Sequence, residues 1–531
     1  MAPARPKPSS TRSAPIAAID IGSNAVRFAL ARVDSTRNLR IIEERRRPTR
    51  LGANLASSKP LPRTAVKATI AAVKEFCFDA MRHGTRSMRL VATAAVRESS
   101  DGPAFVRRLH AEVGLPVEII GPDEEARLAF ASCSAAFDLR RQHVAIVDIG
   151  GGSVQVSFAH RGLLYESVSM PLGAVRLTSM FASESARARG GSSARVQKHV
   201  QNTIKDRLPL GKLQPTAIIG CGGTFATIGT LLGDFAGQRS LAPVLARGPR
   251  SVARSGHAAR DLIELVASIE KLDPARRSEL LRKSGVPVDR SDILPAGLLV
   301  ARALVKHLDV KSFVAHAGGV RDGLLREMAA PSPQMNIVDQ ARALARVGDE
   351  DPAHSEHVAH IAGALLHDLA DVDRVREALA DRPDATELLE CAALLHDIGV
   401  PIDYDRHHKV SRRIIELAHW RGTDPLIRAM IANTARYHRK SLPAARHTPF
   451  EALPPRARQV VRVLAGVLRI ADGLDRSHNQ ATSGVRVRIT RSALEIAAEG
   501  ARAGSPNIRA ASKKSDLLAA AIRRTITVIP G

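Results

Sequence analysis

The chain has 531 residues, of which 44% are hydrophobic and 25% charged, a composition typical of a folded globular protein. A chain of this length is too long to fold around a single hydrophobic core, and three or four domains are predicted. The formal net charge of +25 favours a polyanionic partner, although a genome-wide preference for arginine is an alternative source for part of it.

Several function classes are disfavoured by the composition. Aromatic residues make up only 3% of the chain, which argues against dedicated nucleic-acid binding because base stacking needs aromatic rings. No apolar run approaches the ~20 residues of a membrane span, so no membrane partner is expected. Residues 1–14 are basic and rich in Pro and Ser, typical of a disordered tail rather than a signal peptide. Four scattered cysteines (Cys77, Cys133, Cys221 and Cys391) suggest buried thiols in a reducing compartment, and hence a cytoplasmic protein.

The first predicted element is a hairpin that begins at Ile16. A short apolar run leads into Asp20, then a bend at Gly22-Ser23-Asn24, and then an alternating apolar pattern. Gly22 lets the backbone approach a ligand closely, and Ser23 and Asn24 offer donors beside exposed turn N–H groups. Such a bend suits phosphate oxygens, with Asp20 placed to hold a metal ion or water against them.

Two further segments of the first half offer groups for an anionic ligand. A predicted strand at 39–44 leads into a loop over 45–52 with four arginines, which would guide an anionic chain. After a predicted helix at 64–83, a strand ends at Thr93 and a helix opens at 94–98. Thr93 and Arg97 at that helix start are candidates for phosphate binding.

A strand at 117–120 precedes a strong helix start. Pro122 is followed by Asp123, Glu124 and Glu125, and the helix should run to about residue 137. A carboxylate at the positive end of a helix stays ionised at neutral pH and can act as a general base toward water. For two of the three acids, interaction with the helix dipole is a sufficient explanation.

The opening hairpin pattern recurs over residues 144–158. Asp148 aligns with Asp20 and Gly150 with Gly22, and the second bend continues through Gly151, Gly152 and Ser153. Repetition at domain-sized separation predicts two facing hairpins that clamp a polyphosphate group. A third anion-type loop follows a strand at Gly222-Gly223-Thr224. Repeated strand–turn–helix units up to Gly323 indicate an α/β fold in two lobes, with the ligand between them.

The composition changes around residues 329–333, and a helical pattern rich in histidine then extends to about residue 479. Adjacent His396 and Asp397 can chelate one cation, with His354 and Asp472 completing its coordination. His408 and His438 are further candidates in the same stretch. The last segment is expected to form a small α+β appendage with strands at 485–490, 494–498 and 525–529 and a helix at 515–523.

In order and spacing, these motifs resemble the exopolyphosphatase / guanosine-pentaphosphate phosphohydrolase (Ppx/GppA) family of the actin–sugar kinase–Hsp70 superfamily. The resemblance covers about residues 15–330, and the histidine region resembles the HD-type metal phosphohydrolase domain of longer members. The stretches that carry it are 20–24, 92–97, 121–127, 148–153, 222–224 and 321–323, together with His396-Asp397.

The resemblance implies a definite fold and domain order. Actin-like lobes would occupy residues 15–140 and 141–328, an all-helical HD-type domain residues 335–480, and the α+β appendage residues 481–531. It also implies a homodimer.

The implied activity is hydrolysis of terminal phosphates from linear polyphosphate. Glu125 matches the catalytic base and Arg97 the phosphate-holding arginine, and Asp148, with Asp20, would hold Mg²⁺ or Mn²⁺. Phosphate-cradling positions would be Asp20, Gly22, Ser23, Asn24, Thr93, Gly150, Gly151, Gly152, Ser153, Gly222, Gly223 and Thr224. A second divalent metal in the HD-type domain would take His354, His396, Asp397, His408, His438 and Asp472.

One departure leaves the metal chemistry open. Members of the family usually have a glutamate where this chain has Gln155, and the loss of charge should weaken metal binding there. Four alternatives remain: guanosine pentaphosphate (pppGpp) hydrolysis, a kinase-like ATPase, hydrolysis in the HD-type domain with the lobes as a sensor, and a non-catalytic polyphosphate-binding regulator, which Gln155 favours.

Overall fold

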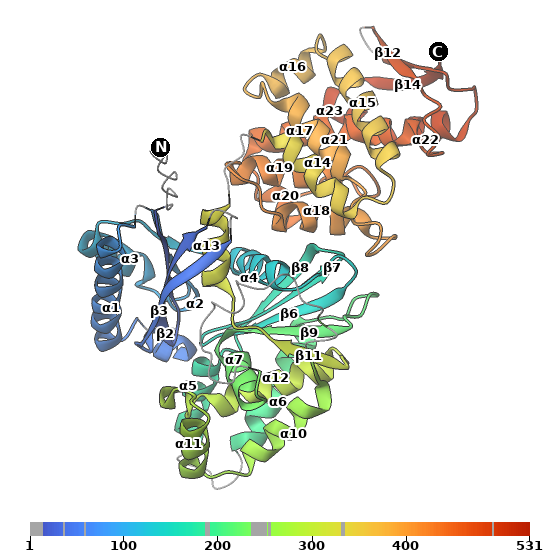
Figure 1. Ribbon diagram of the computed structural model, residues 1–531. Helices are drawn as coiled ribbons and strands as arrows, with labels where there is room; N and C mark the ends of the chain where they lie inside the picture. The colour runs from blue at the N-terminus through green and yellow to red at the C-terminus, as the bar shows by residue number, and fades with distance from the viewer. Residues whose placement is uncertain are drawn as a thin grey trace, which may run out of the picture. The chain divides into compact units, whose positions relative to one another are not determined.

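The structure, a computed structural model, describes residues 14–34, 38–57, 60–85, 87–185, 192–234, 252, 256–330, 335–490 and 493–531 (Figure 1). The chain divides into two compact units. Residues 1–162 and 167–331 form the first, here the two-lobed unit, and residues 163–166 and 332–531 form the second, the helical unit. The expected tail lies outside the described residues except for Ala14, as does most of the predicted composition change at 329–333.

The first lobe is built on a five-stranded sheet with the strand order β3-β2-β1-β4-β5. Its first strand pairs antiparallel with the second and parallel with the fourth, as the predicted hairpin requires. The elements are β1 (Ile16–Ile21), β2 (Ala25–Val33), β3 (Leu39–Pro48), β4 (Ser87–Ala92), β5 (Val117–Ile119), η1 (Leu51–Ser57), α1 (Arg63–Arg82), α2 (Ala94–Arg97), α3 (Gly102–Val113) and α4 (Pro122–Ala136).

Alternation of side chains along β1 and β2 buries both faces of this sheet. Ile19 and Phe28 face the core formed with α1 and α3, where Phe28 stacks on Phe76 with ring centroids 5.1 Å apart. Ala18 and Ala29 face the opposite core, formed with α4 and the last helix of the unit. Burial on both faces explains why β1 reads as a continuous apolar run rather than an alternating one.

The second lobe carries a six-stranded sheet with the order β10-β11-β9-β6-β7-β8. Its strands β6 and β7 form the second predicted hairpin. The elements are β6 (His143–Ile149), β7 (Val154–His160), β8 (Leu163–Met170), β9 (Ala217–Cys221), β10 (His257–Ala258), β11 (Ser312–Ala315), α5 (Ala174–Ser185), α6 (Ser192–Arg207), α7 (Gly222–Leu231), α10 (Ala259–Glu270), α11 (Pro274–Lys283), η2 (Val288–Arg290), α12 (Leu294–His307) and α13 (Val320–Ala329).

Helix α4 packs on both lobes. Leu128 belongs to the core under β1, whereas Cys133 belongs to the core under β6, where its Sγ lies 3.6 Å from that of Cys221. The first turn of α4 holds Pro122 and the three acids, as the sequence predicts. Because the helix is anchored to both sheets, it fixes the position of its first turn relative to both hairpins.

The hydrophobic core of the helical unit includes the C-terminal segment. Leu494 and Leu518 pack into the same core as Leu464, and a Cβ on Gly466 would lie 2.8 Å from the Leu518 backbone. The predicted appendage is therefore an integral layer of this unit. The elements are α14 (Ile337–Gly348), α15 (Pro352–Asp368), α16 (Asp373–Leu379), α17 (Ala385–Leu395), α18 (His407–Leu417), α19 (Pro425–Arg436), α20 (Thr448–Glu451), α21 (Pro455–Leu474), β12 (Gly484–Ile489), β13 (Ala493–Glu499), α22 (Pro506–Lys514), α23 (Asp516–Ile522) and β14 (Thr525–Pro530).

The predicted basic loop over 45–52 is corrected by the structure. Strand β3 continues to Pro48, so Arg45 and Arg47 lie on a strand and pair with Glu75 of α1. Arg46 donates to both carboxylate oxygens of Asp289, at 3.0 and 2.6 Å. These side chains are engaged in ion pairs and are not free to guide an anionic chain.

Two other predictions concern the rest of the chain. All four cysteines are free and buried, as predicted. Among the helices of the described residues, none combines the length and apolarity needed to cross a bilayer.

Candidate active site

The two bends have the same backbone closure. Gly22 N donates to Ala25 O at 3.2 Å, and Gly150 N donates to Ser153 O at 3.1 Å. Across each ladder, Asp20 faces Arg27 and Asp148 faces Gln155. The repeat read from the sequence is therefore a repeat of hydrogen-bond register as well as of residue type.

The bends also lie against each other. A Cβ on Gly151 would stand 3.1 Å from Ser23 Cβ, and one on Gly152 would stand 2.5 Å from Ser23 Oγ. A side chain at Gly152 would force Ser23 or Leu55 to move, and one at Gly151 would be tightly packed, so the close approach of the two loops accounts for the second glycine pair. The N–H groups of Ser23, Asn24, Gly151 and Gly152 donate to no protein oxygen within the described residues and remain available to a ligand.

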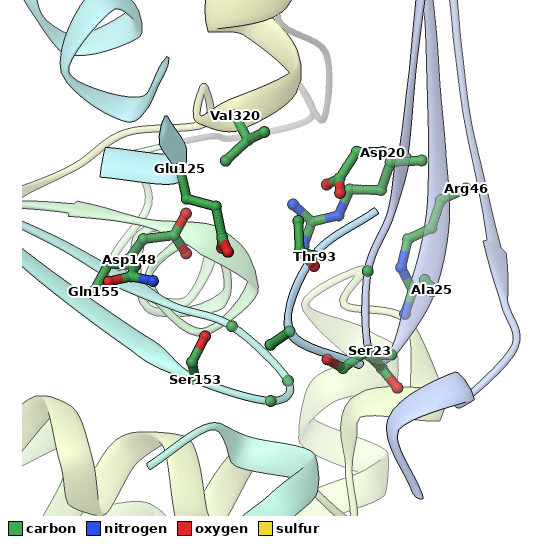
Figure 2. A pocket seen from close by; sticks show the side chains of 17 residues that line it. Asp20, Ser23, Ala25, Arg46, Thr93, Glu125, Asp148, Ser153, Gln155 and Val320 are labelled. Carbon is green, nitrogen blue, oxygen red and sulfur yellow. The ribbon is translucent and has the colours of Figure 1, made fainter. Parts of the chain in front are cut away.

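Between the bends lies a cavity of about 80 Å³. It is large enough to admit a few water molecules or a phosphoryl group. Figure 2 shows the carboxylates of Asp20, Glu125 and Asp148 directed toward this space from different elements. The lining residues are Asp20, Gly22, Ser23, Asn24, Ala25, Arg27, Arg46, Thr93, Ala94, Glu125, Asp148, Gly150, Gly151, Gly152, Ser153, Gln155 and Val320.

Glu125 is a candidate base in this cavity. Arg97 donates through one Nη to Glu125 Oε1 and also to Ile120 O, the latter at 2.7 Å, so the carboxylate is held in one orientation. Burial raises the pKa of Glu125 to about 7; Arg97 opposes the shift, and Asp148 and Asp20 add to it. A base with such a pKa exchanges protons near neutral pH.

The two aspartates are destabilised as anions in the same way. Burial raises the pKa of Asp148 to about 6 and also raises that of Asp20, while the positive charge of Arg27 opposes both shifts. Three carboxylates thus share a small, poorly solvated space. Full ionisation of all three requires additional positive charge.

The residues present fit a divalent metal ion. Asp20 Oδ1 and Gln155 Oε1 are buried and have no hydrogen-bond partner within the described structure. Together with Asp148 they form a set of hard oxygen donors, the type that Mg²⁺ prefers. Gln155 supplies its oxygen without a charge.

Four predicted residues do not line the cavity. Arg97 acts on it through Glu125, and Thr224 is buried against Gly297. Gly222 and Gly223 line a neighbouring cavity of about 260 Å³ instead. Gly222 nevertheless contributes to the site, because its φ is +78° and a Cβ there would overlap Asp148 Oδ1.

Sequence reasoning missed Arg27, which lines both cavities. Within the described part of the chain, the Arg27 side chain forms no hydrogen bond or ion pair, unlike the other arginines of the neighbouring cavity. The repeated hairpin pattern could have indicated this residue, because Arg27 occupies the position in the first hairpin that Gln155 occupies in the second.

In the helical unit, the structure brings together most of the predicted metal-site residues. His354, His396, Asp397, His438 and Asp472 fall into three overlapping groups whose candidate ligand atoms lie within 4.8 Å of one another. The sixth member is His407, the first residue of α18, and not the predicted His408.

The fold and the cavity together define a two-lobed α/β protein with a phosphate-sized, carboxylate-rich site. Comparison with known proteins gives the particular family. Residues 30–331 match the Ppx/GppA phosphatase family, and residues 340–500 match Ppx/GppA phosphatase, domain III. The first match covers more than half of the chain, so the chain belongs to the Ppx/GppA phosphatase family, whose members hydrolyse phosphoanhydride bonds.

Individual relatives agree with this assignment. A guanosine-5'-triphosphate,3'-diphosphate pyrophosphatase from Vibrio parahaemolyticus is 25% identical over 441 residues, covering 82% of each chain. An uncharacterized protein from Streptomyces coelicolor is 26% identical over 309 residues, which span 58% of this chain and 88% of that protein. The solved structure of an exopolyphosphatase from Cytophaga hutchinsonii covers 59% of this chain and 97% of its own, at 19% identity and a TM-score of 0.50. The last similarity supports the two-lobe fold.

Proposed function

We propose that the chain is an exopolyphosphatase, which removes terminal phosphates from linear polyphosphate in the cavity between the two bends. The observation that carries the proposal is the convergence of a buried carboxylate, Glu125, and two facing glycine bends on one small cavity that can admit a phosphoryl group. The main-chain N–H groups of the two bends, which have no protein acceptor among the described residues, would donate hydrogen bonds to the terminal phosphate.

In the proposed reaction, Glu125 takes a proton from water while the water oxygen attacks the terminal phosphorus in line. The bond from that phosphorus to the bridging oxygen breaks, and the shortened chain keeps the bridging oxygen. Arg97 keeps Glu125 in place, and Arg27 lies where it can hold a phosphate oxygen. A Mg²⁺ or Mn²⁺ ion on Asp148, Asp20 and Gln155 would offset the charge of the phosphate oxygens.

The neighbouring cavity offers a nucleotide base no aromatic side chain among the described residues, and it offers a phosphate one arginine without an ion pair, Arg27. Five arginines line it, and none of its lining residues in the described structure is aromatic. A purine is usually held by stacking on aromatic or guanidinium planes, and four of these arginines are engaged: Arg45, Arg46, Arg290 and Arg321. Arg27 at the junction of the cavities would meet the second phosphate of the chain.

Replacement of Arg27 by glutamine should raise KM for long-chain polyphosphate about 10- to 100-fold, because a hydrogen bond to a charged group contributes roughly 1.5–3 kcal/mol. Steady-state phosphate release measures this. Arg40→Gln is the matched control, since Arg40 is exposed on the adjoining strand and lines neither cavity. An unchanged KM in Arg27→Gln would remove this arginine from the binding path.

Replacement of Gln155 by glutamate should lower the Mg²⁺ concentration for half-maximal activity about tenfold, since a charged oxygen replaces a neutral one beside Asp148. Mn²⁺ binding followed by electron paramagnetic resonance should tighten in parallel. Without metal, the variant should unfold at a lower temperature, because a further carboxylate is buried next to Asp148. If only the variant turned over substrate, the wild-type chain would be a polyphosphate-binding regulator.

The second candidate is pppGpp hydrolysis, favoured by the name of the Vibrio parahaemolyticus relative. The two substrates are separated by measuring kcat/KM for polyphosphate and for pppGpp on the same preparation. The proposal expects the higher value for polyphosphate. A higher value for pppGpp would leave the hydrolytic site in place and correct its substrate.

A further inference from the structure

Helix α5 begins directly behind the second bend. The main-chain N–H groups of its first turn donate to carbonyl oxygens of that bend: Ala174 N to Gly150 O at 2.9 Å, and Val175 N and Arg176 N to Gly151 O at 2.9 and 3.1 Å. Gly173 permits this approach, because a Cβ there would lie 2.3 Å from the carbonyl carbon of Gly152. The start of α5 therefore holds the bend from one side.

The side chain of Arg176 continues this pattern at the third carbonyl of the bend. Its Nε donates to Gly152 O at 2.8 Å, and the side chain is only 12% exposed. In a trans peptide the N–H points away from the C=O of the same unit. Because the start of α5 takes the carbonyls of residues 150–152, the N–H groups of residues 151–153 are directed to the opposite side. Those three residues line the cavity, so their N–H groups are the ones a phosphate would meet there.

The rest of the Arg176 guanidinium reaches the first lobe. One Nη donates to Leu55 O of η1 at 3.4 Å, and the other contacts Glu98 Oε2. Glu98 directly follows α2, next to Arg97. A planar guanidinium presents its donors in fixed directions. One side chain thus holds the second bend and two segments of the first lobe in a fixed relation.

Glu98 connects Arg176 to the candidate base. Its Oε1 lies 4.0 Å from one Nη of Arg97, and the other Nη of Arg97 donates to Glu125 Oε1. Four side chains of alternating charge therefore lead from the second bend to the base: Arg176, Glu98, Arg97 and Glu125. Because Arg176 engages Oε2, Glu98 stays at the limit of ion-pair distance from Arg97. Arg97 thereby keeps its contact with Glu125.

We propose that Arg176 is a positioning residue of the site between the bends: it fixes the phosphate-directed N–H groups of the second bend and, through Glu98, keeps Arg97 in place. The assignment rests on the proposed function, in which the bend holds the terminal phosphate and Glu125 is the base. In the described structure Arg176 does not line the cavity, so it acts through these groups and not on the substrate.

Glu98 can pair with either of two arginines, and this competition distinguishes positioning from structural damage. Without Arg176, Glu98 Oε2 loses its partner, and the carboxylate can close on Arg97 and draw it away from Glu125. Removing the charge of Glu98 should then increase activity. In the wild-type chain, the same change removes the anion between two guanidinium groups and should lower activity slightly.

The first measurement is kcat for long-chain polyphosphate, on the full chain. Arg176→Ala should lower kcat about 10²-fold, because small displacements of reacting groups have effects of that size. Glu98→Gln alone should lower kcat about threefold, as expected for a partly exposed ion pair. The double variant should be about tenfold more active than Arg176→Ala, because the two residues belong to one network. A double variant no more active than Arg176→Ala would overturn the proposal.

The second measurement is the Kd for inorganic phosphate with Mg²⁺ present, by titration calorimetry, which needs no turnover. Arg176→Ala should raise this Kd about tenfold, since an N–H of the bend no longer donates to the charged phosphate. Ethylguanidinium, which matches the missing group, should restore part of the affinity and part of kcat. An equal Kd in the wild type and in Arg176→Ala would overturn the proposal. If the wild type bound phosphate but released none from polyphosphate, the proposed function would fail, and the phosphate titration would still decide the role of Arg176.

Arg302→Ala is the matched control. Arg302 lies on α12 of the same unit, its side chain is 15% exposed, and it pairs with Glu270 at 2.7 Å, but it lines neither cavity. The control should lose stability with no change in kcat or in the Kd for phosphate, and ethylguanidinium should not increase its activity.

Circular dichroism and thermal unfolding establish that each variant is folded. If Arg176→Ala does not fold, Arg176→Lys takes its place in both measurements. Its ammonium can reach Gly152 O or Glu98 but cannot present the planar fork that holds both. The same gain of activity on adding Glu98→Gln is expected in that background, and its absence would count against the proposal in the same way.

Discussion

Replacing Glu125 with glutamine is expected to lower kcat on long-chain polyphosphate by about 10³-fold, within the range that a positioned general base contributes. Glutamine keeps the size and the hydrogen bond from Arg97 but cannot take a proton from water. Phosphate release under saturating substrate measures the effect. Glu124→Gln is the matched control, because Glu124 lies in the same helical turn and pairs with Arg127. Equal loss in both variants would mean that the helix start, and not the base, had been damaged.

The same residue should set the pH dependence of the wild-type enzyme. Burial raises the pKa of Glu125 to about 7, and the base acts only when ionised. For the free enzyme, kcat/KM should therefore fall about tenfold per pH unit below 7 and level off above it. This acid limb should be absent from the residual activity of Glu125→Gln. A limb that persists in the variant would assign the titration to another group.

Replacing Gly222 with alanine is expected to cost at least about 10²-fold in kcat, because small displacements of reacting groups have effects of that size. Its φ of +78° disfavours a side chain, and the added Cβ would overlap Asp148 Oδ1. The free energy of unfolding should also fall, by roughly 1–2 kcal/mol from backbone strain alone. Steady-state kinetics and denaturant unfolding measure the two effects.

Gly114→Ala separates the two causes. Gly114 has a similar φ of +71° at the end of α3, but no atom lies within 4 Å of its Cβ position. The control should therefore show the loss of stability with full activity. If Gly222→Ala also kept full activity, Asp148 would not be a sensitive part of the site.

The sequence was most informative where a pattern was repeated. Asp20 and Asp148 could be paired from the amino-acid sequence alone, because each stands at the end of a strand next to a glycine bend. Glu125 could be narrowed to three acids by the helix start, and the family resemblance selected it. The structure adds that α4 packs on both sheets and carries Glu125 to the cavity.

The misses have physical causes. The sequence predicted a loop at arginines 45–47 because their charges interrupt the apolar pattern of a strand. In the structure these arginines lie on the edge strand β3, where ion pairs with residues of α1 and η2 stabilise them. His407 and His408 are adjacent, and only the exact start of α18 decides which ring turns toward the cluster. Thr224 follows a glycine pair typical of anion loops, but its side chain packs against Gly297 in the core.

Arg27 and Gln155 occupy equivalent positions in the two hairpins, but only Arg27 carries a charge, so the charge is distributed unequally between the two sides of the cavity. Asp20 faces a guanidinium across its ladder and Asp148 faces a neutral amide, although the positive charge of Arg27 opposes the rise in the pKa of both aspartates. A linear anion bound between the two hairpins would therefore have a guanidinium beside the first hairpin and a neutral amide beside the second. Exchanging the two residues, Arg27→Gln with Gln155→Arg, would move the positive charge from the first hairpin to the second and leave the summed charge of the site the same.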